Sequence, residues 1–157
     1  MADVKAIPDG FEGATPYLTV HDGAAALDFY AKALGAVETV RMPDPNGKIG
    51  HAEFKIGNAT IMMSDEYPEM DVVSPKRLGG ATSGLMIYVE DVDAVFAQAV
   101  AAGAEVIQPI TDQFYGDRSG QVRDPFGHKW SIATHVADVD PEEMARRAQA
   151  YYDANPS

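Results

Sequence analysis

The chain of 157 residues contains no cysteine. This absence excludes disulfide bridges, zinc–thiolate sites and cysteine nucleophiles, and it is compatible with a reducing compartment. The sequence also lacks an uninterrupted apolar run of about 18 residues, the length that a membrane-spanning helix needs. Its first ten residues have no apolar core of the kind found in signal peptides. We therefore expect a soluble, cytoplasmic protein with no membrane partner.

Basic residues are scarce, since 12 Lys and Arg stand against 24 Asp and Glu, which gives a formal net charge of -12. A surface of this sign repels phosphate backbones, so we do not expect nucleic acid as a partner. Hydrophobic residues make up 46% of the chain, a content typical of a packed globule rather than a disordered segment. The length is that of one ordinary domain.

Two segments of the sequence resemble each other at a fixed spacing. Residues 18–22 (Leu-Thr-Val-His-Asp) match residues 87–91 (Ile-Tyr-Val-Glu-Asp), and 91 − 22 = 69. Each segment has the composition of a short strand, and its final Asp is suited to cap a helix. A pattern of helical periodicity follows in each half and ends at Gly35 or Gly103, where glycine favours the left-handed conformation that closes helices.

Three further strands are predicted after the helix in each half. They comprise residues 37–42, 49–56 and 59–64 in the first half, and 105–110, 114–123 and 128–135 in the second. The last two strands of the second half are joined by Asp124-Pro125-Phe126-Gly127, a sequence typical of a type I turn. The predicted fold is therefore α+β, with two βαβββ modules.

The remaining segments set the expected domain boundaries. We expect a flexible N-terminus over residues 1–13, module one over 14–66, a linker rich in Pro and Gly over 67–81, and module two over 82–139. Residues 140–157 are predicted to form a C-terminal helix and tail. Pro141 at the first helical position and two glutamates in the first turn favour that helix.

The order of elements, with Asp-Pro-Phe-Gly-His at 124–128 before the last strand, resembles the vicinal oxygen chelate superfamily. That group includes glyoxalase I, extradiol dioxygenases, fosfomycin-resistance proteins and bleomycin-binding proteins. Residues 51–53, 113–118 and 124–128 resemble its PhnB-like or glyoxalase-like members, which are of bacterial type. The resemblance covers roughly residues 15–135 and implies a homodimer, since the clefts of these proteins are often completed between chains.

The resemblance also implies four positions for a divalent metal, one on the first and one on the last strand of each half. These positions hold Thr15, Met62, Gly84 and Ser131. None of them offers the imidazole or carboxylate that hard and borderline divalent ions prefer. We therefore expect no metal cofactor at the usual site and no glyoxalase I activity. The alternative is a displaced divalent metal held around His51 and Glu53, with Asp65, Glu66 and His135 at nearby strand ends.

Strand alternation places a mixed set of aromatic, thioether and polar side chains on the face opposite the helices, which forms the ligand cleft in the resembled fold. The predicted ligand-binding residues on this face are Tyr17, His51, Glu53, Met62, Met86 and Tyr88. Such a mixture suits a small, partly apolar or aromatic molecule fixed by a few hydrogen bonds.

Tyr115 and Arg118 belong to an aromatic-Gly-x-Arg segment that resembles the groove edge of bleomycin-binding members. Tyr115 is predicted to line the cleft. Arg118 can clamp a carboxylate or phosphate through two parallel hydrogen bonds. The alternative for Arg118 is a structural ion pair with Asp117 or Asp124.

These observations leave three functions open. The first is a binding protein that sequesters a small molecule, as the resistance proteins of the resembled superfamily do. The second is a metal-dependent lyase, isomerase or dioxygenase with His51 and Glu53 as displaced ligands. The third is an enzyme without metal in which His51 or Glu53 is the catalytic base.

Overall fold

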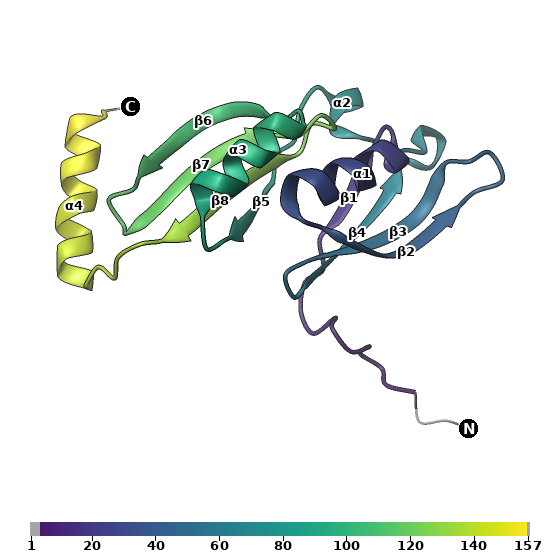
Figure 1. Cartoon of the computed structure of the whole chain (residues 1–157), viewed down its shortest axis with the longest axis horizontal. Helices are drawn as coiled ribbons and strands as arrows, with labels where there is room; N and C mark the ends of the chain where they lie inside the picture. Colours follow the sequence, from purple (N-terminus) through teal and green to yellow (C-terminus); the bar gives the residue numbers. More distant parts are fainter. Residues whose placement is uncertain (1–3, 157) are drawn as a thin grey trace. The chain divides into compact units, whose positions relative to one another are not determined.

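A computed structural model describes residues 4–156 of the chain. It contains two four-stranded sheets with a helix on one face of each, followed by a C-terminal helix (Figure 1). The predicted α+β class with two βαβββ modules is confirmed. The structure divides into two compact units. The first extends to Thr82 and includes Pro125–Gly127, and the second comprises Ser83–Asp124 and the chain from His128 onward.

The first unit contains one sheet and three helical segments. Its elements are β1 (Tyr17–Val20), α1 (Gly23–Leu34), β2 (Val37–Pro43), β3 (Ile49–Ile56), β4 (Ala59–Asp65), the 3-10 helix η1 (Pro68–Met70) and α2 (Pro75–Leu78). The strand order is β1-β4-β3-β2, with β1 parallel to β4 and the other neighbours antiparallel. The segment predicted as a linker therefore contains two short helical turns.

The second unit repeats this plan. Its elements are β5 (Gly84–Tyr88), α3 (Val92–Ala102), β6 (Glu105–Asp112), β7 (Asp117–Arg123), β8 (Lys129–His135) and α4 (Pro141–Ala154), and the strand order is β5-β8-β7-β6. No described helix has the length and apolar character needed to span a membrane. Residues 4–16 form no helix or strand. Residues 1–3 of the predicted flexible N-terminus and residue 157 of the predicted tail lie outside the described residues.

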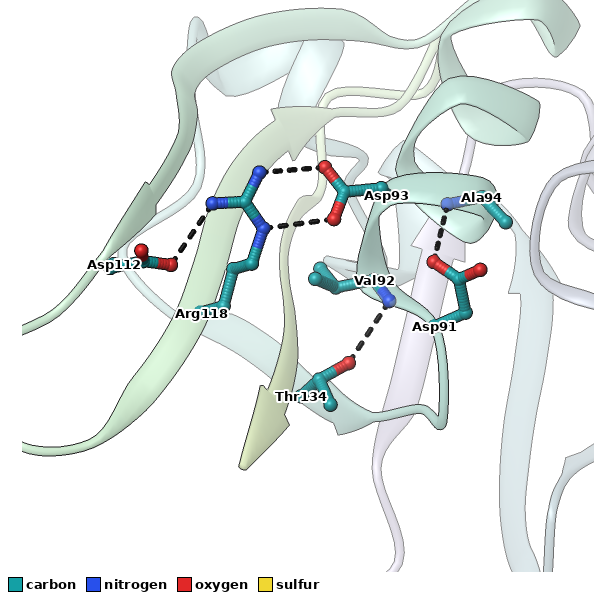
Figure 2. A network of polar contacts seen from close by, with 7 residues as sticks. All are labelled: Asp91, Val92, Asp93, Ala94, Asp112, Arg118 and Thr134. Carbon is teal, nitrogen blue, oxygen red and sulfur yellow. Dashed lines mark hydrogen bonds and ion pairs between the residues drawn. The ribbon is translucent and has the colours of Figure 1, made fainter. Parts of the chain in front are cut away.

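Both repeat helices begin and end as their sequences predict. Asp22 Oδ1 accepts a hydrogen bond from Ala25 N at 3.0 Å, and Asp91 Oδ1 accepts one from Ala94 N at the same distance (Figure 2). Such a cap stabilises a helix by about 1 kcal/mol. The cap residues at the other ends are Gly35 and Gly103, both in the left-handed conformation.

Aromatic rings fill the core of the first unit. Tyr30 of α1 is fully buried and stacks on Phe54 of β3 with ring centroids 5.1 Å apart. Phe126 packs against Phe29 of the same helix at 6.0 Å. Each fully buried ring of this kind contributes about 1.5–3 kcal/mol of burial free energy, so this cluster fixes α1 on one face of the sheet and leaves the other face available.

The core of the second unit is organised around Trp130. Its side chain is 1% exposed, and its Nε1 donates to Asp124 Oδ2 at 2.9 Å. Asp124 Oδ1 accepts from His128 N at 2.9 Å, so the same carboxylate also closes the turn between β7 and β8. Gly120 lies under α3, because a Cβ there would stand 2.6 Å from the ring of Phe96. The even-numbered residues around Gly120 in β7 therefore face the helix.

The predicted start of one strand is wrong. The sequence places a strand from residue 114, whereas β7 begins at Asp117. Residues 113–116 form a turn in which Gly116 N donates to Gln113 O at 3.1 Å and Gly116 has a φ of 98°. A Cβ on Gly116 would lie 2.0 Å from the carbonyl oxygen of Ala137, so the close approach of that backbone fixes the turn here.

Candidate functional site

Three of the predicted site residues meet on the face of the first sheet opposite α1. The hydroxyl of Tyr17 lies 2.9 Å from Nδ1 of His51, and Nε2 of the same ring lies 3.1 Å from Glu53 Oε1. A neutral imidazole with its proton on Nε2 satisfies both contacts, since it donates to Glu53 and accepts from Tyr17. Met62 of β4 is the register partner of both Tyr17 and Glu53, so it lies on the same face.

An irregularity in β3 lies directly before His51. Met42 pairs with His51, but the next pair is Pro43 with Ile49, so Gly50 is an extra residue between the two pairs. Such an insertion changes the alternation of side chains. Ile49 is therefore buried in the core while His51, two residues later, lies on the opposite face.

A cavity of about 560 Å³ adjoins this network within the first unit. This volume falls in the usual range of about 300–1,000 Å³ for ligand pockets. We name the segment at residues 67–78 the strap and this cavity the strap pocket, because the first part of the strap forms one wall. The pocket is lined by Tyr17, Thr19, Gly50, Ser64, Tyr67, Met70, Asp71, Val72 and Val73.

The strap is anchored at its two ends by one carboxylate. Glu66 accepts hydrogen bonds from Arg77 Nη2 at 2.8 Å and from Ser74 N at 3.1 Å. The hydrogen bond from Arg77, followed by those from Ser74, lowers the pKa of Glu66 to about 2. Ser74 is fully buried, so the strap is held here by packing of Ser74 as well as by the hydrogen bonds to Glu66.

Tyr67, the first strap residue, contacts one charged group through its hydroxyl and another through the face of its ring. Its hydroxyl donates to Asp44 Oδ2 at 3.1 Å, and the ammonium of Lys48 lies 4.7 Å from its ring centroid. Desolvation, together with the hydrogen bond to Asp44 and the negative charges of Asp44, Asp65 and Glu69, raises the pKa of the Tyr67 hydroxyl.

The second sheet has its own polar network on the face opposite α3. Tyr88 Oη donates to Asp117 Oδ2 at 2.6 Å, and His135 Nδ1 lies 2.8 Å from Asp117 Oδ1. His135 Nε2 lies 3.0 Å from the exposed carboxylate of Asp138. The Asp117 carboxylate is therefore engaged on both oxygens although its residue is only 4% exposed.

This network shifts three pKa values. Desolvation opposes the ionisation of Asp117, but hydrogen bonds from Tyr88 and His135 and the charge of His135 outweigh it and lower the pKa of Asp117. The hydrogen bonds to Asp117 and Asp138 raise the pKa of His135. The hydrogen bond to Asp117, together with desolvation of the hydroxyl, raises the pKa of Tyr88.

Arg118 lies apart from these networks. It projects from β7 toward α3, where its guanidinium holds both carboxylate oxygens of Asp93 at 2.8 Å and Asp112 Oδ1 at 3.0 Å (Figure 2). The predicted partners, Asp117 and Asp124, are wrong. Asp117 is adjacent in the strand and therefore points to the opposite face, and Asp124 lies six residues further on (124 − 118 = 6), roughly 20 Å along an extended strand. The sequence does not indicate Asp93 as a partner, because Asp93 lies 25 residues before Arg118 and reaches it only through the packing of α3 on the sheet.

The remaining predicted ligand-binding residues divide between the two units. Met86 and Tyr88 lie on β5 and are both exposed. Tyr115 lies in the turn before β7, and its ring centroid is 5.3 Å from that of Phe114. In the first unit, Asp65 is buried and accepts from Gly23 N at 2.8 Å and from Ile49 N at 2.6 Å. This carboxylate therefore holds the start of α1.

The four positions that the resembled superfamily uses for metal carry no suitable donor set in either unit. Met62 offers a thioether, Gly84 has no side chain, and Ser131 Oγ accepts from Gln121 Nε2 at 3.2 Å. Thr15 precedes β1. These residues do not fit a divalent metal. Within residues 4–156, no three His, Asp or Glu side chains are arranged to hold a metal ion.

Comparison with known proteins places the fold in a family. The sequence model of the Glyoxalase/Bleomycin resistance protein/Dioxygenase superfamily matches residues 14–132. An uncharacterized protein of Mycobacterium bovis is 44% identical over 133 residues, which cover 83% of this chain and 88% of that protein. An uncharacterized protein of Mycobacterium tuberculosis is also 44% identical over 133 residues, covering 83% of this chain and 78% of that protein.

Solved structures agree with this assignment. The crystal structure of TioX from Micromonospora sp. ML1 is 28% identical with a TM-score of 0.62, and the match covers 82% of this chain and 100% of that chain. A gene product from Arabidopsis thaliana is 25% identical with a TM-score of 0.63, over 78% and 98% of the two chains. The chain belongs to the glyoxalase/bleomycin resistance protein/dioxygenase superfamily.

Proposed function

We propose that this protein binds a small, partly apolar or aromatic molecule in the strap pocket and sequesters it without the metal site of its family. The observation that carries the proposal is the cavity of about 560 Å³ between the first sheet and the strap. Apolar side chains of Met70, Val72 and Val73 form one part of its lining, while Thr19 and Ser64 bring hydroxyl groups. This combination is the usual chemistry of sites that enclose small amphipathic molecules.

Tyr17 supplies a positioned polar group at this pocket. Its side chain is 52% exposed, yet its hydroxyl is held by His51, which Glu53 holds in turn. A ligand can therefore meet an aromatic ring and a phenolic oxygen whose orientation is already fixed. Fixing a binding group in advance reduces the entropy that is lost on binding.

The same chain of contacts favours a second candidate, an enzyme. Tyr17, His51 and Glu53 are linked as an acid, a base and an orienting carboxylate, an arrangement that can move a proton to or from a bound molecule. A metal-dependent lyase, isomerase or dioxygenase would instead use His51 and Glu53 as displaced ligands. We place sequestration first because the strap pocket can bind a small molecule without a metal ion or a catalytic step.

We also propose the PhnB-like subgroup, a homodimer and a cytoplasmic location for this chain. Residues 51–53 and 113–118 support the subgroup. A PhnB protein from Bacillus cereus has the same fold with a TM-score of 0.62 at 18% identity, which bears on the fold alone. Light scattering at micromolar concentration tests the dimer, and a monomer there contradicts it.

Native mass spectrometry of freshly purified protein tests these candidates together, because it reports subunit number, bound metal and retained ligand. Sequestration predicts a protein that carries a small organic molecule or takes up added 4-tert-butylphenol, with binding unaffected by a chelator. A stoichiometric divalent ion that is lost in His51→Ala supports the metal enzyme and overturns sequestration without metal.

Two variants connect that binding to the pocket. Thr19 corresponds in the repeat to Tyr88 (19 + 69 = 88), so Thr19→Tyr places in the pocket a side chain that the second sheet already carries. This substitution should abolish uptake of 4-tert-butylphenol. Thr82→Tyr, at an exposed position outside the pocket lining, is the matched control and should bind normally.

A further inference from the structure

The strap pocket has one charged side chain in its lining. Asp71 lines the cavity, and no Lys, Arg or His is among the lining residues. Within residues 4–156, the side chain of Asp71 makes no hydrogen bond or ion pair, whereas Glu66 at the start of the strap is fully engaged by Arg77 and Ser74. The carboxylate of Asp71 is therefore available to a ligand.

The backbone holds Asp71 in an unusual conformation. Its φ is 61°, the left-handed region, and it is the single residue other than glycine with a positive φ among the described residues. Its N–H donates to Pro68 O at 3.1 Å and ends η1. Asp and Asn tolerate this region better than other side chains, although glycine would be less strained. The conformation thus keeps a charged side chain at a position where glycine would relieve the strain.

Aromatic rings at the same pocket add a second feature that attracts cations. Tyr17 and Tyr67 both line the cavity. The ring of Tyr67 already accepts one cation, since the Lys48 ammonium lies 4.7 Å from its centroid, and Lys48 is not part of the lining. Desolvation and the hydrogen bond to Asp44 raise the pKa of the Tyr67 hydroxyl, and the negative charges of Asp44, Asp65 and Glu69 act in the same direction.

We infer that the strap pocket selects organic cations, in which an ammonium or amidinium group is carried on a small aromatic or aliphatic body. This inference rests on the proposed function and names the class of its ligand. The cationic group would lie near Asp71 and the tyrosine rings, and the apolar body against Met70 and Val72. Rings and a carboxylate together recognise quaternary ammonium groups because such cations are weakly hydrated and easily desolvated.

The test compares two probes of the same shape that differ in charge. In 4-(trimethylammonio)phenol, a positively charged nitrogen replaces the central carbon of the tert-butyl group of 4-tert-butylphenol. Protein with 13C-labelled methionine methyls is titrated with each probe, and the shift of the Met70 methyl reports occupancy of the pocket. The cation is expected to bind about fivefold more tightly than the neutral probe.

Two variants separate the local carboxylate from the net charge of the protein. Asp71→Asn retains a side chain that accepts the left-handed backbone, and it should lower the affinity for the cation about fivefold without changing that for the neutral probe. Glu142→Gln removes the same charge from an exposed position on α4 and should change neither affinity. Thermal unfolding of both variants verifies that they remain folded.

The outcomes distinguish this inference from the proposed function. Equal binding of the two probes, or an effect of Glu142→Gln as large as that of Asp71→Asn, overturns the selection of cations while binding by the strap pocket stands. If neither probe shifts the Met70 methyl, both the inference and the proposed function are overturned.

Discussion

Tyr17 and His51 are 34 residues apart in the sequence, and the Tyr17 hydroxyl lies 2.9 Å from His51 Nδ1 across three neighbouring strands. Their rings are tilted by 46° with centroids 5.7 Å apart, so the pair makes both a hydrogen bond and a ring contact. This pair connects the strap pocket, which Tyr17 lines, to the carboxylate of Glu53. It is therefore where binding and any proton transfer would be coupled.

Tyr17→Phe keeps the ring and removes only the hydroxyl. We expect the affinity for 4-tert-butylphenol to fall about threefold to tenfold, because one hydrogen bond contributes about 0.5–1.5 kcal/mol. The free energy of unfolding should change by less, since the Tyr17 side chain is exposed to water. Titration and urea unfolding measure the two effects. Tyr88→Phe is the control, because it removes a hydrogen bond to the buried Asp117 in the second unit. It should lower the free energy of unfolding and leave the affinity unchanged. An unchanged affinity in Tyr17→Phe, or a weakened one in Tyr88→Phe, contradicts the placement of the pocket.

The pair of His135 and Asp117 predicts a pH dependence of stability. The lowered pKa of Asp117 gives a contribution that is present above its unfolded value of about 3.9 and is lost as the pH falls through the folded value. The raised pKa of His135 gives one that is fully present below about pH 6.5 and is lost as the pH rises through the folded value. The pair should stabilise the fold most between about pH 4 and 6.5.

His135→Gln removes the basic member of this pair. We expect it to lower the Tm more at pH 5.5 than at pH 8.5, and differential scanning calorimetry at the two values measures the difference. Asp117→Asn, examined in the same way, should also lower the Tm more at the acidic value, because it removes the carboxylate that binds the imidazolium. Equal losses at both pH values would show that the pair is not charged in the folded protein.

Gly116→Ala should be strongly destabilising. The new Cβ would stand 2.0 Å from the carbonyl oxygen of Ala137, and the φ of 98° is unfavourable to alanine. We expect a loss of more than about 2 kcal/mol in the free energy of unfolding, measured by urea denaturation. Gly57→Ala is the control, because Gly57 also has a positive φ but has no atom within 4 Å of the new Cβ. It should cost about 1 kcal/mol, and equal losses for both would exclude the clash as the cause.

Glu66→Gln should loosen the strap without unfolding the sheet. The neutral amide loses the charged hydrogen bonds with Arg77, so amide hydrogen exchange should quicken over residues 67–78 and stay unchanged in β4. Glu69→Gln, within the same strap, should leave exchange near the wild-type rate. Since the pKa of Glu66 is lowered to about 2, the anchor should persist from neutral pH to about pH 4.3 and weaken as the pH falls toward 2. Unchanged exchange in Glu66→Gln contradicts the anchor.

Much of the fold could be predicted because its signals are local. The caps at Asp22 and Asp91 and the glycines that end both helices follow directly from residue types, and the spacing of 69 residues relates the two modules. The start of β7 could not be predicted, because Phe114 and Tyr115 have strand-like composition. The backbone near Ala137, which fixes the turn at Gly116, comes from a distant part of the chain.

The sequence predicts which side chains share the sheet face of the candidate site, but it does not predict the contacts between them. Alternation puts Tyr17, His51 and Glu53 on one side, yet the hydrogen bonds between them depend on the register of β1, β4 and β3. The Pro and Gly content of residues 67–81 is typical of a linker, so the sequence does not indicate Tyr67 and Asp71 as pocket residues. A short helix start at Ser74-Pro75 was the signal that could have indicated order there.

The central claim, that the strap pocket holds a small molecule, is tested most directly by intermolecular nuclear Overhauser effects with bound 4-tert-butylphenol. The proposal predicts effects between the tert-butyl protons and both the Met70 methyl and the Tyr17 ring, and their loss in Thr19→Tyr. Effects confined to residues outside the pocket lining, or unchanged effects in Thr19→Tyr, would contradict it.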